Sequence, residues 1–292
     1  MEQTYYLIII GALLVEYALS TISSIFNMKS ITEKIPDGFQ EYYDEEKYSS
    51  SQSYLKDKTR FGLFSGTFGL CVTLIVIHTG VFGMLDDLAR SYSSHYITAG
   101  LIFFGILFIF NDIINIPFSI YSTFVIEEKY GFNKTTWKTY VTDKLKGYGL
   151  TIVLGSIVIV PILYFFETYG SNGWWIAWVL ITGFMIAIQP LFVHVIAPMF
   201  NKFEPLEEGE LRNSIEEFAN KVAFPIGRID VMDGSRRSAH SNAYFSGFGK
   251  SRRIALFDTL MEKHSTDEIV SVVAHEVGHY KNCLLYTSPS PR

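Results

Sequence analysis

Five long apolar blocks are the feature of this sequence that most constrains its fold. They run over Tyr5–Phe26, Phe61–Met84, Ile97–Val125, Gly149–Phe166 and Trp174–Phe200. A helix rises about 1.5 Å per residue, and the hydrocarbon core of a bilayer is about 30 Å thick. Each block is therefore long enough to cross a membrane as a helix. We expect an α-helical integral membrane protein, a multi-span helical bundle in which five spans are present.

Composition excludes several other classes of protein. Hydrophobic residues make up 49% of the 292 residues and charged residues only 18%, against about 25% charged in ordinary soluble domains. This apolar content excludes a disordered chain. With 24 basic residues and a net charge of −5, no nucleic-acid partner is expected. Two cysteines, Cys71 and Cys283, cannot form a disulfide framework or a cysteine-rich zinc finger.

The charges of the loops predict an orientation. The four loops that follow spans one to four carry six, one, five and no Lys or Arg in turn, and the segment after span five is again basic. Because cytosolic loops carry the excess of basic residues, the N-terminus is predicted to be luminal and everything after Phe200 cytosolic.

Several polar residues interrupt the apolar blocks, and two interpretations of them stay open. They could line a wet interior, or they could form hydrogen bonds between helices. For Glu16, which is ionisable and lies mid-span, neither interpretation is preferred. The residues concerned are Glu16, His78, Asn111, Asp112, Asn115, Gln189 and His194.

The predicted domains are a membrane domain over residues 1–200 and a cytosolic segment over residues 201–282. In that segment, helical spacing of apolar residues predicts a helix over Glu210–Phe224. Alternating patterns predict strands at Arg228–Met232, Asn242–Phe245 and Arg253–Phe257, the last two as a hairpin. The connector ends in Gly249-Lys250-Ser251, but the first glycine of a phosphate-binding loop would be Tyr244, so a turn is expected.

The strongest chemical signal is an H-E-x-x-H motif on a predicted helix. That helix begins with a capping box, Ser265-x-x-Glu268. Residues four apart lie on one helical face, so His275 and His279 can both direct an imidazole at one Zn²⁺ ion. Zinc would lower the pKa of a bound water, Glu276 would accept its proton, and the hydroxide would attack a peptide carbonyl.

Three other polar residues near the motif are weaker candidates. His240 is interpreted as a loop residue rather than a ligand, and His264 as a residue that caps the end of a helix or turn. Asn242 opens a strand just before the metal-binding helix. It could hold the backbone of an extended substrate, or it could simply be a turn residue, and its position alone does not decide between them.

Two stretches of the cytosolic segment, together with the motif, resemble one family. They are Ser241-Asn242-Ala243-Tyr244-Phe245-Ser246-Gly247-Phe248 and Arg252-Arg253-Ile254-Ala255-Leu256-Phe257-Asp258-Thr259-Leu260, and the stretch Glu127–Thr136 is also similar. The pattern from span one to Asn282 resembles the type I CAAX prenyl proteases, the Ste24-like membrane zinc metalloproteases of peptidase family M48.

The resemblance implies a fold, an activity and a set of site residues. It implies seven spans around a water-filled chamber, a small α+β zincin-like cytosolic domain and one Zn²⁺ per chain. It implies removal of the C-terminal aaX tripeptide from prenylated CAAX proteins in the endoplasmic reticulum membrane, with the inner nuclear membrane as a second location. By match, His275 and His279 would be zinc ligands, Glu276 the general base, and Asn242, Ala243 and Tyr244 part of the substrate-binding strand.

The end of the sequence departs from the family's pattern. The third zinc ligand of the family is a Glu that follows two further spans, whereas here no acidic residue follows Glu276. Residues 283–292 are interpreted as a translated sequencing adapter, and the chain as C-terminally truncated. A catalytic zinc site usually has three protein ligands, so this polypeptide is expected to bind zinc weakly and to be inactive.

Two other functions compete with the prenyl protease. One is a related M48 membrane protease that degrades misfolded membrane proteins. The other is a non-catalytic membrane scaffold in which the incomplete site is genuine. In every case membrane lipid is an expected partner.

Overall fold

The computed structural model describes residues 2–224, 226–246 and 253–281. The chain divides into two compact units, Met1–Gly131 and Phe132–Arg292. Each is treated separately below.

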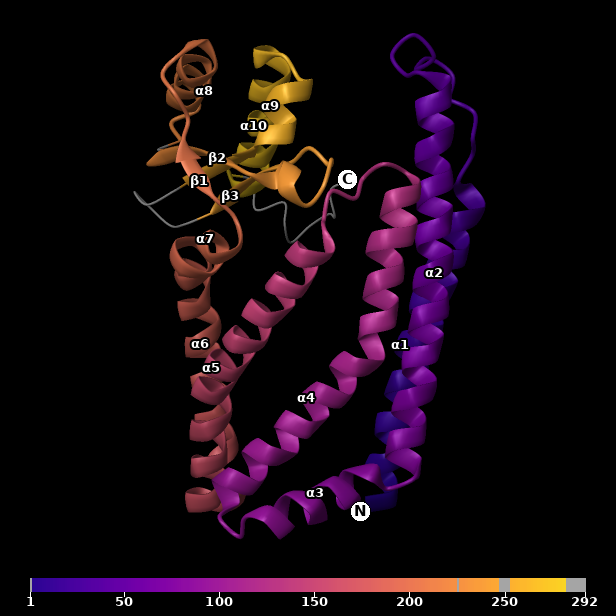
Figure 1. Cartoon of the computed structure of the whole chain (residues 1–292), viewed down its shortest axis with the longest axis vertical. Coiled ribbons are helices and arrows are strands. Elements are labelled where there is room, and N and C mark those ends of the chain that lie inside the picture. Colours follow the sequence, from indigo (N-terminus) through magenta and orange to yellow (C-terminus); the bar gives the residue numbers. More distant parts are fainter. Residues whose placement is uncertain (1, 225, 247–252, 282–292) are drawn as a thin grey trace. The chain divides into compact units, whose positions relative to one another are not determined.

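The first unit is built from long helices. They are α1 (Glu2–Ser30), α2 (Glu45–His78), α3 (Val81–Tyr92) and α4 (Tyr96–Tyr121), and α4 continues directly into the π-helical segment η1 (Ser122–Glu127). Helices α1 and α2 pack side by side (Figure 1). Asp44 caps α2, because its carboxylate accepts a hydrogen bond of 2.8 Å from the backbone N–H of Lys47.

The second apolar block does not form one uninterrupted helix, as the sequence predicted over Phe61–Met84. Helix α2 ends at His78, and Gly80 adopts a left-handed φ of 72° before α3 begins at Val81. Glycine reaches this conformation at little steric cost, which makes it a natural point for the chain to turn. The run of hydrophobic residues continues through the turn, so hydropathy alone could not locate it.

The second unit begins with helices and ends with a small sheet. Its helices are α5 (Trp137–Tyr169), the 3₁₀ turn η2 (Gly170–Gly173), α6 (Trp174–Leu191), the π-helical η3 (Phe192–Ile196) and α7 (Ala197–Phe200). Helices α5 and α6 pack on each other (Figure 1). Thr136 caps α5. The helix begins at Trp137, well before the apolar block at Gly149, so the polar residues between them are also helical.

In the part of the chain that the structure describes, four strands form the sheet, in the order β1-β2-β4-β3. Their bounds are Phe203–Pro205 for β1, Arg228–Met232 for β2, Ala243–Ser246 for β3 and Arg253–Phe257 for β4. Strands β2 and β4 are parallel, whereas β1 pairs with β2 and β3 with β4 in antiparallel fashion. The predicted hairpin is confirmed by the β3–β4 pairing, and its connector lies outside the described residues.

Helices α8 (Glu210–Lys221) and α10 (Thr266–Lys281) pack against each other on one side of the sheet (Figure 1). Between them and the strands lies a core of buried aliphatic side chains, among them Ile215 of α8, Leu256 of β4 and Val273 of α10. The 3₁₀ turn η4 (Gly234–Arg236) and the short helix α9 (Asp258–Lys263) complete the sheet region.

The predicted class of fold is confirmed, since five helices among the described residues are long and apolar enough to span a membrane and a small α/β region accompanies them. Many of their large apolar side chains are exposed, including Leu7, Phe26, Ile152 and Ile186, as a hydrocarbon environment would allow. The domain boundary at residue 200 and the interpretation of residues 283–292 stay predictions. That last stretch lies outside the described residues.

Among the intramembrane polar residues, His78, Asn111 and Asn115 take part in hydrogen bonds. The Nδ1 atom of His78 lies 3.2 Å from the hydroxyl of Tyr6, and the amide of Asn115 donates to the carbonyl and the side chain of Asn111. Glu16 is exposed. The contact of His78 joins α2 to α1, as the interpretation of hydrogen bonds between helices expects, whereas the bonds of Asn115 and Asn111 lie within α4.

Candidate metallopeptidase site

Helix α10 carries the predicted metal ligands, and its start is fixed by the predicted capping box. The carboxylate of Glu268 accepts hydrogen bonds from the backbone N–H of Ser265 at 2.8 Å and from its hydroxyl at 3.0 Å. These two bonds, the backbone one foremost, hold the pKa of Glu268 below its usual value. The capping box thus sets where the helix begins, and with it the phase of the residues that follow.

The two faces of α10 have different neighbours. Ile269, Val273 and Val277 recur every four residues and are buried in the core against the sheet and α8. Each residue advances the helix by roughly 100°, so His275 projects on the side opposite to Val273. Its side chain is exposed. The helix is therefore anchored through one face and presents the motif on another.

The two histidines converge as a metal pair would. Their Nε2 atoms lie 2.9 Å apart, and their rings meet edge to face with centroids 4.5 Å apart. Two nitrogens bound at about 2.0–2.1 Å to a tetrahedral zinc ion would be roughly 3.3 Å apart. A small opening of the pair would let both hold one ion, so the geometry fits zinc as far as these two ligands go.

The described residues do not complete a zinc site. Within them, no group of three or more His, Cys, Asp or Glu side chains is placed to hold a metal ion. The Nδ1 atom of His279 is buried and has no hydrogen-bond partner in the described part of the chain. Metal-bound histidines usually donate this second ring nitrogen to an acceptor, and no such acceptor is present there.

Strand β3 lies beside α10 and forms the edge of the sheet. Ala243 belongs to the same buried core as Val273 and Val277, and α10 packs directly on the strand. Strand β3 comes last in the order β1-β2-β4-β3, so no described strand pairs with its outer side. An extended peptide could add to this edge by backbone hydrogen bonds.

The backbone of β3 shows which groups face that edge. The carbonyl of Asn242 accepts a bond of 3.0 Å from the N–H of Phe257, so Asn242 is directed toward β4. In an antiparallel pair the next residue, Ala243, has its backbone groups facing outward. The N–H of Ala243 is contacted at 2.9 Å by the side-chain oxygen of Asn242. The Asn242 side chain therefore lies along the open edge.

Tyr244 differs from Asn242 and Ala243 in what its side chain contacts. Its hydroxyl lies 3.9 Å from the sulfur of Met232, and its ring meets that of Phe257 edge-on with centroids 6.3 Å apart. Burial raises the pKa of the Tyr244 phenol above its usual value. Its side chain packs on the sheet, so among the three predicted substrate-binding residues Asn242 and Ala243 are better placed at the edge.

His240 and His264 make contacts that do not involve His275 or His279. The ring of His240 stacks on Phe132 with centroids 4.0 Å apart, in a loop as predicted. His264 directly follows α9, which ends at Lys263, and its Nδ1 lies 3.7 Å from the carboxylate of Glu268. Neither ring is part of a metal-binding group among the described residues.

The sequence did not single out the ionic cluster at the sheet. Asp230 of β2 is fully buried and accepts hydrogen bonds from Arg228 and from Arg253, whose guanidinium also stacks over Phe203 at 4.0 Å. Arg253 and Arg228 border a cavity of about 490 Å³ together with His194. The only sequence signal was an acidic residue inside a predicted buried strand, which implies a nearby cation.

Helices that can span a membrane and an H-E-x-x-H helix beside an open strand define the class of a membrane-spanning metallopeptidase. Comparison with known families agrees. The family model described as CAAX prenyl protease N-terminal, five membrane helices, matches residues 24–202, and that of peptidase family M48 matches residues 205–284. The chain belongs to family M48, in its Ste24-like group of CAAX prenyl proteases.

Individual relatives give the extent of the similarity. The chain is 35% identical to CAAX prenyl protease 1 of Saccharomyces cerevisiae over 94% of this chain and 63% of that protein. It is 41% identical to the probable CAAX prenyl protease 1 of Schizosaccharomyces pombe over 86% of this chain and 56% of that protein. It therefore spans less than two thirds of the length of these two relatives.

A solved structure is also similar. The crystal structure of S. mikatae Ste24p matches with a TM-score of 0.87 and 35% identity, over 96% of this chain and 68% of that one. The likeness extends over the membrane-spanning helices as well as the sheet region, since it covers nearly the whole chain.

Proposed function

We propose that this chain carries the water-activating half of a zinc metalloendopeptidase that removes the C-terminal aaX tripeptide from prenylated CAAX proteins. The observation that carries the proposal is the convergence of His275 and His279, 2.9 Å apart, on the outward face of a helix that packs beside the open strand β3. The pair offers two metal ligands, and the strand offers a backbone surface for a peptide.

Zinc held by His275 and His279 would supply Lewis-acid activation of water and polarisation of the scissile carbonyl. Glu276 follows the first ligand directly in the helix and is partly buried. Its carboxylate would accept the proton of the attacking water and return it to the leaving amine. Because Glu276 needs to be ionised to accept that proton, its replacement by Gln should remove the step and leave the two histidines in place.

The substrate would bind as an added strand. An extended C-terminal peptide could donate to the outward carbonyl of Ala243, while the side-chain amide of Asn242, whose oxygen accepts from the Ala243 N–H, holds the peptide from the side. The relatives are CAAX prenyl proteases, which supports a prenylated C-terminus as the substrate. We propose the endoplasmic reticulum membrane as the location, with the sheet region on the cytosolic side as the loop charges predict.

The donor set of the described residues supports a further expectation for the zinc affinity of the site. Two histidines alone hold zinc less firmly than the three protein ligands usual in catalytic sites. We therefore propose that zinc held by His275 and His279 alone is bound weakly, and that peptide cleavage needs a third ligand.

Zinc binding by the purified 292-residue chain tests the ligand assignment. Zinc affinity, measured by competition with a chromogenic chelator, should be weak in the wild type and lost in His279→Ala. The matched control is His264→Ala, which removes a histidine that contacts Glu268 instead and should leave zinc affinity unchanged. Equal affinity in the wild type and His279→Ala would contradict the assignment.

A chimera tests the activity. Residues 1–281 joined to the remaining C-terminal part of the S. cerevisiae relative should cleave a farnesylated CAAX peptide and leave the unprenylated peptide largely uncut. Glu276→Gln in that chimera should lower the rate by about 10²- to 10⁴-fold. A rate that survives Glu276→Gln would exclude the proposed base, and robust cleavage by the 292-residue chain alone would exclude the need for a third ligand.

A further inference from the structure

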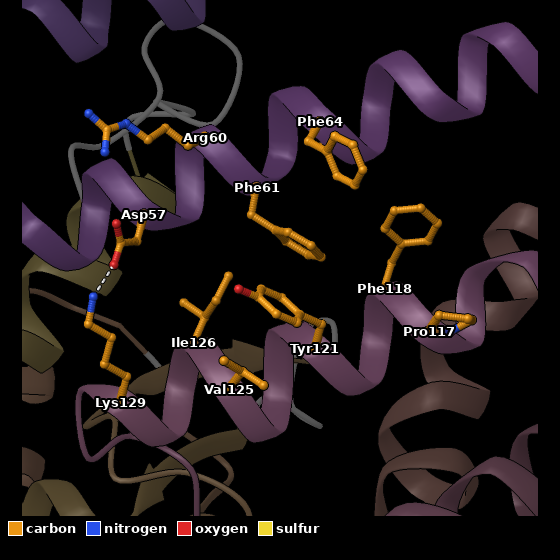
Figure 2. Close-up of a pocket in the computed structure, with 10 residues that line it drawn as sticks. All are labelled: Asp57, Arg60, Phe61, Phe64, Pro117, Phe118, Tyr121, Val125, Ile126 and Lys129. Carbon is orange, nitrogen blue, oxygen red and sulfur yellow. Dashed lines mark hydrogen bonds and ion pairs between the residues drawn. The ribbon is translucent and has the colours of Figure 1, made fainter.

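A cavity in the first unit has no role in the chemistry proposed above. It has a volume of about 750 Å³ and lies between α2 and the continuous helix formed by α4 and η1 (Figure 2). We call it the α2–η1 pocket. All of its lining residues belong to the unit Met1–Gly131, and its size falls within the roughly 300–1,000 Å³ range of ligand sites.

One part of the α2–η1 pocket is aromatic. The rings of Phe61 and Tyr121 stack with centroids 4.9 Å apart, and Phe118 lies 6.1 Å from both Phe61 and Phe64. Phe64 is 64% exposed and Tyr121 is 47% exposed. These rings meet across the two helices but remain uncovered, so the wall they form can accept an apolar ligand (Figure 2).

The π-helical segment η1 widens this apolar wall. In an α-helix the residues three and four positions after Tyr121 share its face, whereas in a π-helix the wider turn brings the residue five positions later to that face. Val125 and Ile126 both line the pocket. The π-helical turn therefore brings Ile126, five positions after Tyr121, to the same wall as Val125.

The other end of the α2–η1 pocket is charged. Lys129 donates to the carboxylate of Asp57 at 2.6 Å, and the hydroxyl of Tyr130 donates to the same oxygen at 2.7 Å. Asp57 is thus neutralised by its own neighbours. Arg60 also lines the pocket and is exposed, and it makes no hydrogen bond or ion pair within the described residues. The polar end therefore carries one surplus positive charge.

The charged end and the aromatic end of the α2–η1 pocket meet where the apolar block of α2 begins. Arg60 is the last residue before the apolar block that begins at Phe61, so with that block in hydrocarbon its guanidinium would be at the level of the headgroups. We propose that the α2–η1 pocket binds an anionic glycerophospholipid, with the headgroup phosphate at Arg60 and one acyl chain along Phe61, Phe118 and Val125. The surplus cation selects an anionic headgroup, and the bilayer itself supplies the ligand at this depth.

Native mass spectrometry of the purified 292-residue chain tests the proposal. The protein is titrated in detergent with phosphatidylserine or phosphatidylcholine of the same acyl chains. A single basic side chain near anionic lipid contributes enough binding free energy to favour an anionic lipid over a neutral one by roughly fivefold. We expect about that preference for phosphatidylserine in the wild type and none in Arg60→Gln.

Two matched control variants test whether a change in lipid binding comes from the α2–η1 pocket or from any loss of charge or gain of bulk elsewhere. Arg90→Gln removes an equal charge from α3, where Arg90 is paired with Asp86, and should keep the preference. Val125→Trp fills the pocket and should weaken binding of both lipids, whereas Val153→Trp, at an exposed site on α5, should not. All four variants are compared only after their helical content has been verified by circular dichroism.

Three outcomes would overturn the proposal. One is an unchanged preference in Arg60→Gln, and another is an equal loss in Arg90→Gln. The third is displacement of the bound lipid by glycerophosphoserine, which has the headgroup without acyl chains, because the site would then recognise a free phosphate rather than a lipid.

Discussion

The guanidinium of Arg237 forms a two-pronged ion pair with the carboxylate of Asp143, at 2.8 Å and 3.0 Å. Asp143 lies in α5, whereas Arg237 follows the turn η4 that leaves β2, so the pair connects a long helix to the sheet region within the second unit. The same guanidinium also donates to the side chain of Asn201 and to the carbonyl of Phe200, at the end of α7. One partly buried side chain thereby connects three segments.

Arg237→Gln should therefore destabilise the second unit. It removes a two-pronged, charge-assisted contact and leaves the carboxylate of Asp143 without its cation, at an expected cost of about 1–3 kcal/mol. A fall in the thermal unfolding midpoint in detergent measures the effect. Arg236→Gln, at the exposed neighbouring position, is the control and should leave the midpoint within error. An equal fall in both variants would mean that the contact contributes nothing specific.

The capping box predicts a pH dependence for α10. Folding lowers the pKa of Glu268, chiefly through the backbone N–H of Ser265. The stabilisation is therefore present above the ordinary glutamate pKa of about 4.3 and is lost as the pH falls through the lower folded value. Glu268→Gln should lower the unfolding midpoint at neutral pH and approach the wild type in acid. The control is Glu262→Gln, a change at an exposed residue of α9, whose unfolding midpoint should follow that of the wild type at every pH. A lower unfolding midpoint of Glu268→Gln that persists in acid would contradict the prediction.

Gly234 is predicted to be intolerant of any side chain. A Cβ atom there would lie 2.5 Å from Cδ2 of Phe257, in the buried turn that follows β2. Gly234→Ala should cost about 1–3 kcal/mol, because Phe257 is packed and must shift. Gly149→Ala is the control: nothing lies within 4 Å of its Cβ position, and a helical glycine tolerates alanine. Unfolding midpoints of the two variants, compared directly, check the prediction.

Local patterns were sufficient to predict the long apolar helices, the helices α8 and α10, and the strands β2, β3 and β4, but not β1, α3 or α9. Apolar length located the five spans, and alternation located β2 and β4 at the bounds that the structure has. The capping box located the start of α10. Each of these signals depends on residues a few positions apart, so the sequence contains them directly.

The errors and omissions have a common physical cause. The turn at Gly80 lies inside an uninterrupted apolar run, and the π-helical segments η1 and η3 differ from an α-helix only in backbone pairing. The contacts of Arg237 and of Asp230 join residues far apart in the sequence. Hydropathy does not register a change of backbone conformation, and pairing between distant side chains depends on topology.

Asp230 provides the last prediction, because its two arginine partners differ in exposure. The side chain of Arg253 is 12% exposed and that of Arg228 is 55% exposed, while Asp230 is fully buried. Asp230→Asn keeps the shape but removes the charge, which leaves Arg253 buried without a counter-charge. Breaking a buried pair in this way costs about 3–5 kcal/mol.

Arg228→Gln, in contrast, should cost about 1 kcal/mol or less, because its charge is largely solvated and Arg253 remains paired with Asp230. Glu207→Gln, which makes the same carboxylate-to-amide change at an exposed site, serves as the control for Asp230→Asn. Denaturant unfolding of the three variants measures the order of their losses in unfolding free energy. If Arg228→Gln proved as destabilising as Asp230→Asn, the burial of Arg253 could not be what makes the pair costly to break.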